Sequence, residues 1–229
     1  PWELSRRKSV SPHDGLGANL IVQVKQNRVM RVLPLENDEI NECWLADRDR
    51  FSYEALNSAE RLTQPKIKQG GQWVSTDWQT ALDYVAKGLQ GVIADHGADA
   101  VGVLATPHST VEELFLAKQL ATGLGVHSTD YRTRRADFSR DTAQAGALWL
   151  GGRIEDLAAA KAVLMIGANL RKEQPLLAAR LRQSVKKGTA LSVIGLANDA
   201  LLMSSHARVT VSPADLLRTT TAVLAAVAT

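Results

Sequence analysis

The sequence predicts an α/β protein in which a small N-terminal β-rich module precedes a doubly wound, mostly parallel α/β domain. Residues 19–34 largely alternate between apolar and polar side chains on both sides of Gln26-Asn27, which is typical of a β-hairpin. Beyond Ser75, short apolar runs alternate with segments of helical periodicity, as expected for successive βαβ units. We therefore assign residues 1–75 to the β module and residues 76–229 to a Rossmann-like α/β domain.

The first half of the α/β domain is outlined by two capping boxes. Thr76–Gln79 predicts the start of a helix that runs on to Gly97. Val101–Thr106 is an apolar run suited to a buried parallel strand. Thr110–Glu113 predicts a second helix, which ends at Gly123 or Gly125.

The second half repeats the pattern after a less regular stretch, residues 126–153. A helix over Glu173–Lys187 is predicted from Pro175 near its first turn and Gly188 just past its end. Another helix is predicted to begin at Pro213. Apolar strands are predicted at Ala162–Gly167, Ala190–Gly195 and Arg208–Ser212. In the β module, a second turn between extended segments is predicted at Lys68–Trp73.

Composition limits the classes of function. The 229 residues carry a net charge of +3, and their basic clusters have no interleaved aromatics, so nucleic-acid binding is not expected. The longest apolar stretches are too short to span a bilayer. The single cysteine, Cys43, can form no internal disulfide and cannot hold an iron–sulfur cluster by itself, which favours a reducing compartment. Because the chain begins at Pro1 and ends within an apolar run, we interpret it as a piece of a longer protein.

We assign no catalytic, cofactor-binding or metal-binding residue. The Gly167 turn could present backbone N–H groups to a phosphate, but with one glycine it fits a tight strand-to-helix turn better. His108 stands between a strand and a helix, where a capping role competes with ligand binding. Arg132, Arg134 and Arg135 could bind an anion or pair with Asp130 and Asp137.

Other side chains are read as structural. Asp137, Asp141, Glu155 and Asp156 show no spacing of an acid/base pair and are interpreted as solvated carboxylates. Five tryptophans are candidates for the core or for contacts buried in a larger assembly, and the core is the preferred interpretation: Trp2, Trp44, Trp73, Trp78 and Trp149.

Three stretches together resemble the large iron–sulfur subunit of bacterial NADH:quinone oxidoreductase, respiratory complex I. These stretches are Val32–Ser58 with Arg61–Pro65, in which Asn41–Phe51 is the most specific part, His127–Phe138, and Gly167–Arg171 with Arg180–Gln183 and Gly188. The resemblance implies the fold of molybdopterin oxidoreductases, in which a small β domain can carry a [4Fe–4S] cluster and α/β domains hold the pterin.

The resemblance also implies where a cluster would be bound. The family pattern Cys-x2-Cys-x3-Cys-x27-Cys falls on Ser11, Asp14, Ala18 and Ala46. Two alanines offer no donor atom, and cluster iron prefers thiolates to the oxygens of Ser and Asp. We therefore expect no cofactor in this fragment and place the [2Fe–2S] and [4Fe–4S] clusters of the parent subunit in a region that precedes Pro1. We expect these four residues to pack the hairpin against the neighbouring loop.

The function implied is that of a structural scaffold in the hydrophilic arm of the respiratory complex, without a catalytic group of its own. The parent complex is a proton-translocating NADH:quinone oxidoreductase. Partners would be the other subunits of that arm and the rest of the same subunit, with no nucleic acid and no direct membrane insertion. The protein would be located on the cytoplasmic side of the bacterial inner membrane, in peripheral association with it. The alternatives are a cofactor-binding fragment of a true molybdopterin oxidoreductase and a small-ligand module with a Rossmann-like site.

Overall fold

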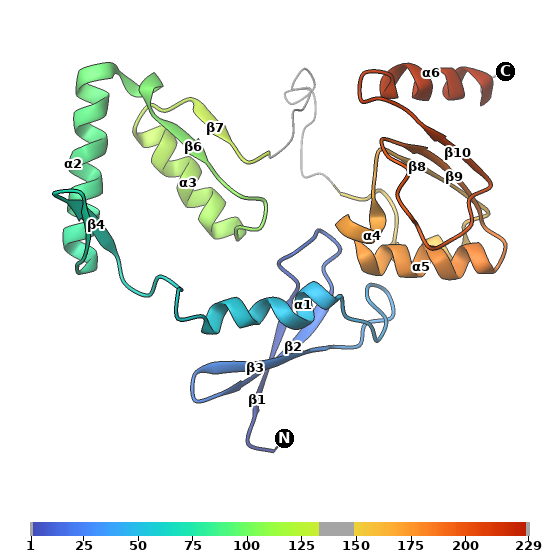
Figure 1. The fold of residues 1–229 in the computed structure, drawn as a ribbon, viewed down its shortest axis with the longest axis horizontal. Coiled ribbons are helices and arrows are strands. Elements are labelled where there is room, and N and C mark those ends of the chain that lie inside the picture. The colour runs from blue at the N-terminus through green and yellow to red at the C-terminus, as the bar shows by residue number, and fades with distance from the viewer. Residues whose placement is uncertain (1, 133–148, 228–229) are drawn as a thin grey trace. The chain divides into compact units, whose positions relative to one another are not determined.

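The computed structural model describes residues 2–132 and 149–227. The chain forms two compact units, one of Pro1–Asn57 with Leu148–Thr229 and one of Ser58–Ala147 (Figure 1). The domain boundary placed at residue 75 stays a prediction.

The first unit begins with a three-stranded antiparallel sheet in the order β1-β2-β3, formed by β1 (Ser5–Val10), β2 (Asn19–Lys25) and β3 (Arg28–Pro34). The predicted hairpin is confirmed as β2 and β3. Its turn residues Gln26 and Asn27 have φ of 49° and 58°, the left-handed backbone that a two-residue type I′ turn requires.

One face of this sheet carries a small core. Leu20, Val32 and Leu45 are buried together, and Tyr53 packs against them from the segment that follows. That segment contains α1 (Asp47–Phe51) and the 3-10 helix η1 (Ser52–Asn57). The buried Asn41 side chain fixes the preceding loop, because its Oδ1 accepts from the Asn19 N–H at 2.9 Å and its Nδ2 donates to the Leu35 carbonyl at 3.1 Å.

The same unit contains a parallel sheet in the order β10-β9-β8. Its strands are β8 (Ala162–Ile166), β9 (Ala190–Gly195) and β10 (Ala207–Thr210), which confirms all three predicted strands. The accompanying helices are η3 (Ile154–Ala159), α4 (Leu170–Glu173), α5 (Pro175–Lys186) and α6 (Leu216–Val227).

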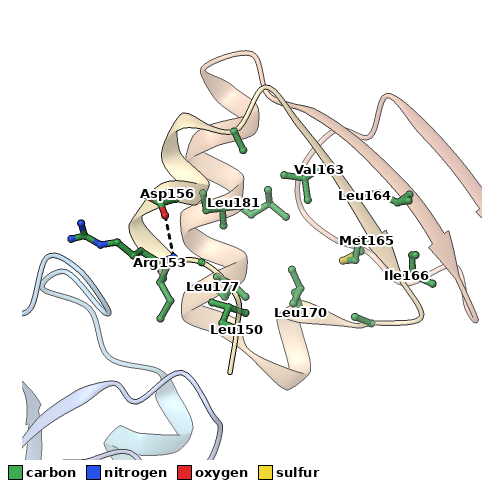
Figure 2. Close-up of a pocket in the computed structure, with 15 residues that line it drawn as sticks. Leu150, Arg153, Asp156, Val163, Leu164, Met165, Ile166, Leu170, Leu177 and Leu181 are labelled. Atoms are coloured by element: carbon green, nitrogen blue, oxygen red, sulfur yellow. Dashed lines mark hydrogen bonds between the residues drawn. The ribbon is translucent and has the colours of Figure 1, made fainter. Parts of the chain in front are cut away.

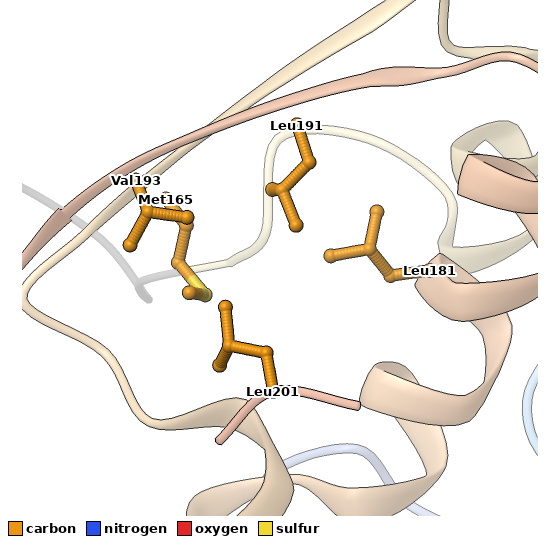
Figure 3. Close-up of a cluster of buried hydrophobic side chains, with 5 residues drawn as sticks. All are labelled: Met165, Leu181, Leu191, Val193 and Leu201. Atoms are coloured by element: carbon orange, nitrogen blue, oxygen red, sulfur yellow. The ribbon is translucent and has the colours of Figure 1, made fainter. Parts of the chain in front are cut away.

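The helix predicted over 173–187 is found as α5, which begins at Pro175, and Gln174 separates it from the short helix α4. This residue has φ −141° and ψ 72°, outside the helical region, because a following proline disfavours helical backbone. Five apolar side chains from β8, α5, β9 and the loop after β9 form the core of this part: Met165, Leu181, Leu191, Val193 and Leu201 (Figure 3).

The second unit opens with an antiparallel hairpin of β4 (Lys66–Gln69) and β5 (Gln72–Ser75), whose turn is the predicted Gly70-Gly71. After it come α2 (Trp78–His96), η2 (Ala98–Ala100), β6 (Gly102–Leu104) and α3 (Val111–Gly123). A short strand that was not predicted, β7 (Ser128–Asp130), pairs in parallel with β6.

The two predicted capping boxes have different outcomes. The box at Thr110 and Glu113 is confirmed, with both reciprocal hydrogen bonds formed. The helix at residue 78 is capped instead by Asp77, whose carboxylate accepts from the Thr80 N–H at 2.9 Å. The hydrogen bonds that the Asp77 carboxylate accepts from the Thr80 N–H and the Thr80 hydroxyl hold the pKa of Asp77 below its ordinary value of 3.8.

The expectation that the tryptophans lie in the core is wrong. Their exposed fractions range from 60% for Trp44 to 89% for Trp2. Trp78 lies on α2, and Ala81 is the one buried residue of this helix, so α2 as a whole is exposed. Among the residues that the structure describes, no helix is both long and apolar enough to cross a bilayer.

Candidate functional site

The four positions of the cluster pattern come together beside α1. The Ser11 hydroxyl donates to Asp49 Oδ1 at 2.6 Å, and the Ser11 N–H donates to the Ala18 carbonyl at 2.8 Å. The Asp49 N–H donates to the carbonyl of Ala46 at 3.0 Å. Ser11, Ala18, Ala46 and Asp49 are all buried, so the loop that leaves β1 is fastened to the start of α1.

Asp14, the second position of the pattern, joins this loop to the α/β part of the unit. One carboxylate oxygen accepts from the Leu16 N–H at 2.9 Å, and the other pairs with Arg48. The Arg48 guanidinium also donates to the carbonyls of Lys172 and Glu173, at 3.2 and 2.7 Å. Arg48 therefore links the cluster-pattern loop to the end of α4.

A second arginine, Arg180, also connects the α/β part of the unit to the N-terminal part. Arg180 of α5 is 9% exposed and donates to the carbonyls of Asp38 and Ile40, at 2.8 and 3.3 Å. Its guanidinium also lies 3.5 Å from the Glu42 carboxylate. We call Arg48 and Arg180, with the carbonyls they bind, the arginine joint. Sequence analysis missed it, because the acceptors are backbone atoms that lie more than a hundred residues away along the chain.

The Gly167 turn is engaged by the protein itself. Its N–H donates to the Ile194 carbonyl at 2.8 Å, and the Asn169 N–H donates to the Glu173 carboxylate at 3.1 Å. The carboxylate thus takes an N–H that a bound phosphate could otherwise use and places a negative charge beside the turn. Gly167 has φ +63°, which supports the prediction of a tight turn. The residues at this turn do not fit a phosphate-bearing pterin or nucleotide.

A cavity of about 470 Å³ lies beside β8. Figure 2 shows that its lining is mainly apolar, with Met165, Leu170, Leu177 and Leu181 contributed by β8, α4 and α5. Arg153 stands at the rim and directs its side chain away from the apolar residues (Figure 2). This lining suits hydrocarbon groups and offers no set of donors for a phosphate.

The remaining candidates fall in the second unit. His108 lies in the turn between β6 and α3, as predicted, and its N–H donates to Thr106 Oγ1 at 3.3 Å. Arg132 Nε lies 3.4 Å from Asp130 Oδ1, which is the predicted structural pairing. The N–H groups of Arg132 and Tyr131 hold the pKa of Asp130 below its usual value. The predicted residues Arg134, Arg135, Asp137 and Asp141 lie outside the described residues.

These features define an α/β protein whose small β sheet is fastened to a Rossmann-like domain. A family model for molybdopterin oxidoreductase matches residues 61–224, so the chain belongs to that family. A model for the NADH-ubiquinone oxidoreductase NDSU1/NuoG-like 4Fe-4S domain matches residues 4–54.

The curated relatives of this chain include subunits of NADH–quinone oxidoreductases. The chain is 37% identical to the G subunit of NADH-quinone oxidoreductase from Rickettsia felis, over 82% of this chain and 27% of the relative. It is 32% identical to the NADH-ubiquinone oxidoreductase 75 kDa subunit of Reclinomonas americana, over 82% of this chain and 28% of that one. The chain thus spans about a quarter of the length of these relatives. Their names do not favour the alternative of a true molybdopterin enzyme.

A solved structure agrees in fold. Acetylene hydratase from Pelobacter acetylenicus superposes with a TM-score of 0.65 and 15% identity, over 88% of this chain and 29% of the hydratase. At this identity the likeness shows the fold, and it confirms the predicted fold class.

The cofactor prediction is wrong. We expected the iron–sulfur region to precede Pro1, whereas the 4Fe-4S domain match lies within the chain, at residues 4–54. The error came from taking the four missing cysteines to mean that the chain holds no iron–sulfur region. The side chains described in this domain do not by themselves fit a complete four-thiolate site, because Cys43 is its one cysteine and is exposed. Among the described residues, no group of three or more His, Cys, Asp or Glu could hold a metal ion. We therefore derive no electron-transfer step from this domain.

Proposed function

We propose that this chain is part of the large iron–sulfur subunit of an NADH–quinone oxidoreductase and acts there as a scaffold. In this role it fixes the iron–sulfur-type β domain against a molybdopterin-type α/β domain within the peripheral arm of a membrane complex. The other subunits of that arm are its partners, and the cytoplasmic side of the bacterial inner membrane is its location. The relatives named above support the identity of the parent complex.

The arginine joint is the observation that carries the scaffold role. Arg48 and Arg180 direct four hydrogen bonds to backbone carbonyls of the opposite part of the unit. A guanidinium presents a planar set of donors, so it fixes orientation as well as distance. Arg153 adds a weaker contact, with its Nη2 3.6 Å from the Glu39 carboxylate.

The test is assembly of the complex. In the organism that carries this sequence, the full-length subunit is replaced by an Arg48→Met, Arg180→Met variant, and the amount of intact complex is measured on native gels. We expect the intact complex to fall several-fold, because each change removes charge-assisted hydrogen bonds worth roughly 1.5–3 kcal/mol.

Arg182→Met is the matched control, since Arg182 lies on the same helix but is exposed. It should leave assembly unchanged. A double variant that assembles as well as the control would contradict the scaffold role. A full-length protein that never co-purifies with NADH–quinone oxidoreductase subunits would contradict the proposed identity.

A further inference from the structure

The β1-β2-β3 sheet concentrates positive charge. Its three strands hold six basic residues and no Asp or Glu, although the whole chain has a net charge of only +3. The basic residues are Arg6, Arg7, Lys8, Lys25, Arg28 and Arg31. Among the ion pairs of the described residues, the only one made by these six joins Lys25 to Glu3. The rest of this charge has no acidic partner in the described chain.

The two edges of the sheet differ. On β3, the Tyr53 hydroxyl donates to the Met30 carbonyl at 3.0 Å, and Asn57 Nδ2 donates to the Val29 carbonyl at 3.0 Å. The β3 edge is therefore covered by η1. On β1, all six residues are exposed, and no backbone hydrogen bond of the described chain joins this strand to any element except β2. The outer edge of β1 is open.

The strand register arranges charge beside this open edge. Arg6 pairs with Gln23, which in turn pairs with Arg31, so the three lie in one row across the sheet. Lys8 is two residues from Arg6 and so shares its face, which lies opposite the face of the core residue Val32. A strand added next to β1 would therefore meet Arg6 and Lys8 on one face and Arg7 on the other.

We propose that the β1 edge binds an acidic, extended polypeptide segment, which pairs with β1 as a fourth strand. Main-chain hydrogen bonds to the open edge would supply affinity, and carboxylates at alternate positions would meet Arg6 and Lys8. A second copy of β1 is disfavoured, because like charges would then face each other. Single-stranded nucleic acid is disfavoured too, since the three strands contain no aromatic side chain on which bases could stack.

This inference rests on the proposed function for the source of the segment, a neighbouring subunit of the complex. The experiment compares the full-length subunit alone with the same subunit in its assembled complex. Backbone hydrogen exchange of Ser5–Val10 is measured, and a photo-reactive residue at Ser9 identifies the neighbour by mass spectrometry. We expect exchange of the outward-facing amides to slow by at least about tenfold on assembly, and the cross-linked peptide to be rich in Asp and Glu.

Charge reversal supplies the specific control. An Arg6→Glu, Lys8→Glu variant should lose the slowed exchange and the cross-link, with the melting temperature of the isolated subunit unchanged. Lys66→Glu, Lys68→Glu is the matched variant, because these exposed residues also stand two apart on a hairpin strand, and it should behave as the unaltered protein.

A failure of this inference can be told apart from a failure of the proposed function. Equal exchange in the free and assembled subunit, or cross-links to lipid, to nucleic acid or to a peptide without acidic residues, would overturn the inference and leave the proposed function standing. A subunit that does not join the complex at all would overturn the proposed function and the inference with it.

Discussion

Replacement of Arg180 by Met tests the arginine joint at a single position. Methionine keeps an unbranched apolar chain in the space of the arginine stem, so packing along α5 is largely retained. What is lost are the hydrogen bonds to the carbonyls of Asp38 and Ile40 and the ion pair with Glu42.

The expected loss is about 2 kcal/mol. Hydrogen bonds from a charged group contribute roughly 1.5–3 kcal/mol. The two bonds together are expected to contribute the lower part of that range for one such bond, because the Ile40 bond is long at 3.3 Å and water can replace the guanidinium at the exposed Asp38 and half-buried Ile40 carbonyls. The Glu42 side chain is 45% exposed, and a screened pair of that kind adds less than about 1 kcal/mol.

The assay is native-state hydrogen exchange of the loop that Arg180 holds. The Glu42 N–H donates to the Asn37 carbonyl at 2.7 Å within this loop, so its exchange reports local opening. A loss of about 2 kcal/mol corresponds to exchange roughly 30-fold faster. The Arg182→Met control should exchange like the unaltered chain. If the Arg180 and Arg182 variants exchange at the same rate, the joint does not hold the loop and the reasoning is refuted.

Three further predictions concern single residues. Leu181→Ala, at a fully buried position, should lower the free energy of unfolding by about 2–5 kcal/mol in urea titrations. Leu217→Ala is the control, because Leu217 is 78% exposed, and it should change the free energy of unfolding by less than about 0.5 kcal/mol. Gly167→Ala should lower the free energy of unfolding by about 1–2 kcal/mol, because Gly167 has φ +63° and the new Cβ would lie 3.4 Å from a methyl carbon of Leu216. Thermal melting measures this loss, and Gly152→Ala is the control, because a Cβ at Gly152 would meet no atom within 4 Å. The lowered pKa of Asp77 means that its cap stabilises α2 above pH 3.8 and is lost as the pH falls through the folded pKa. Helix content followed by circular dichroism should therefore decline at acid pH, and Asp77→Ala should remove the part of that decline which comes from α2.

Much of the α/β pattern could be predicted because its signals are local. Apolar runs bounded by glycine marked β8 and β9, and the Thr110 capping box marked the start of α3. Strand β1 was missed for an equally local reason. It is exposed along its whole length and rich in basic residues, so it shows no apolar alternation, and its pairing with β2 alone makes it a strand.

The candidate site was less accessible from sequence. The resemblance placed the cluster pattern on Ser11, Asp14, Ala18 and Ala46, and the structure shows the loop that begins at Ser11 tied to α1 by the Ser11–Asp49 bond. The partners of Arg48 and Arg180 could not be foreseen, because backbone carbonyls carry no residue-specific signal. The exposed tryptophans show a related limit, since hydrophobicity favours burial without indicating the surface that provides it.

The most direct test of the proposed identity is NADH–quinone reductase activity in membranes from a strain that lacks the gene encoding this chain. The account predicts that the activity is lost on deletion and restored by the full-length gene. Membranes that keep full NADH–quinone reductase activity after the deletion, in a strain with no second copy of the gene, would contradict it.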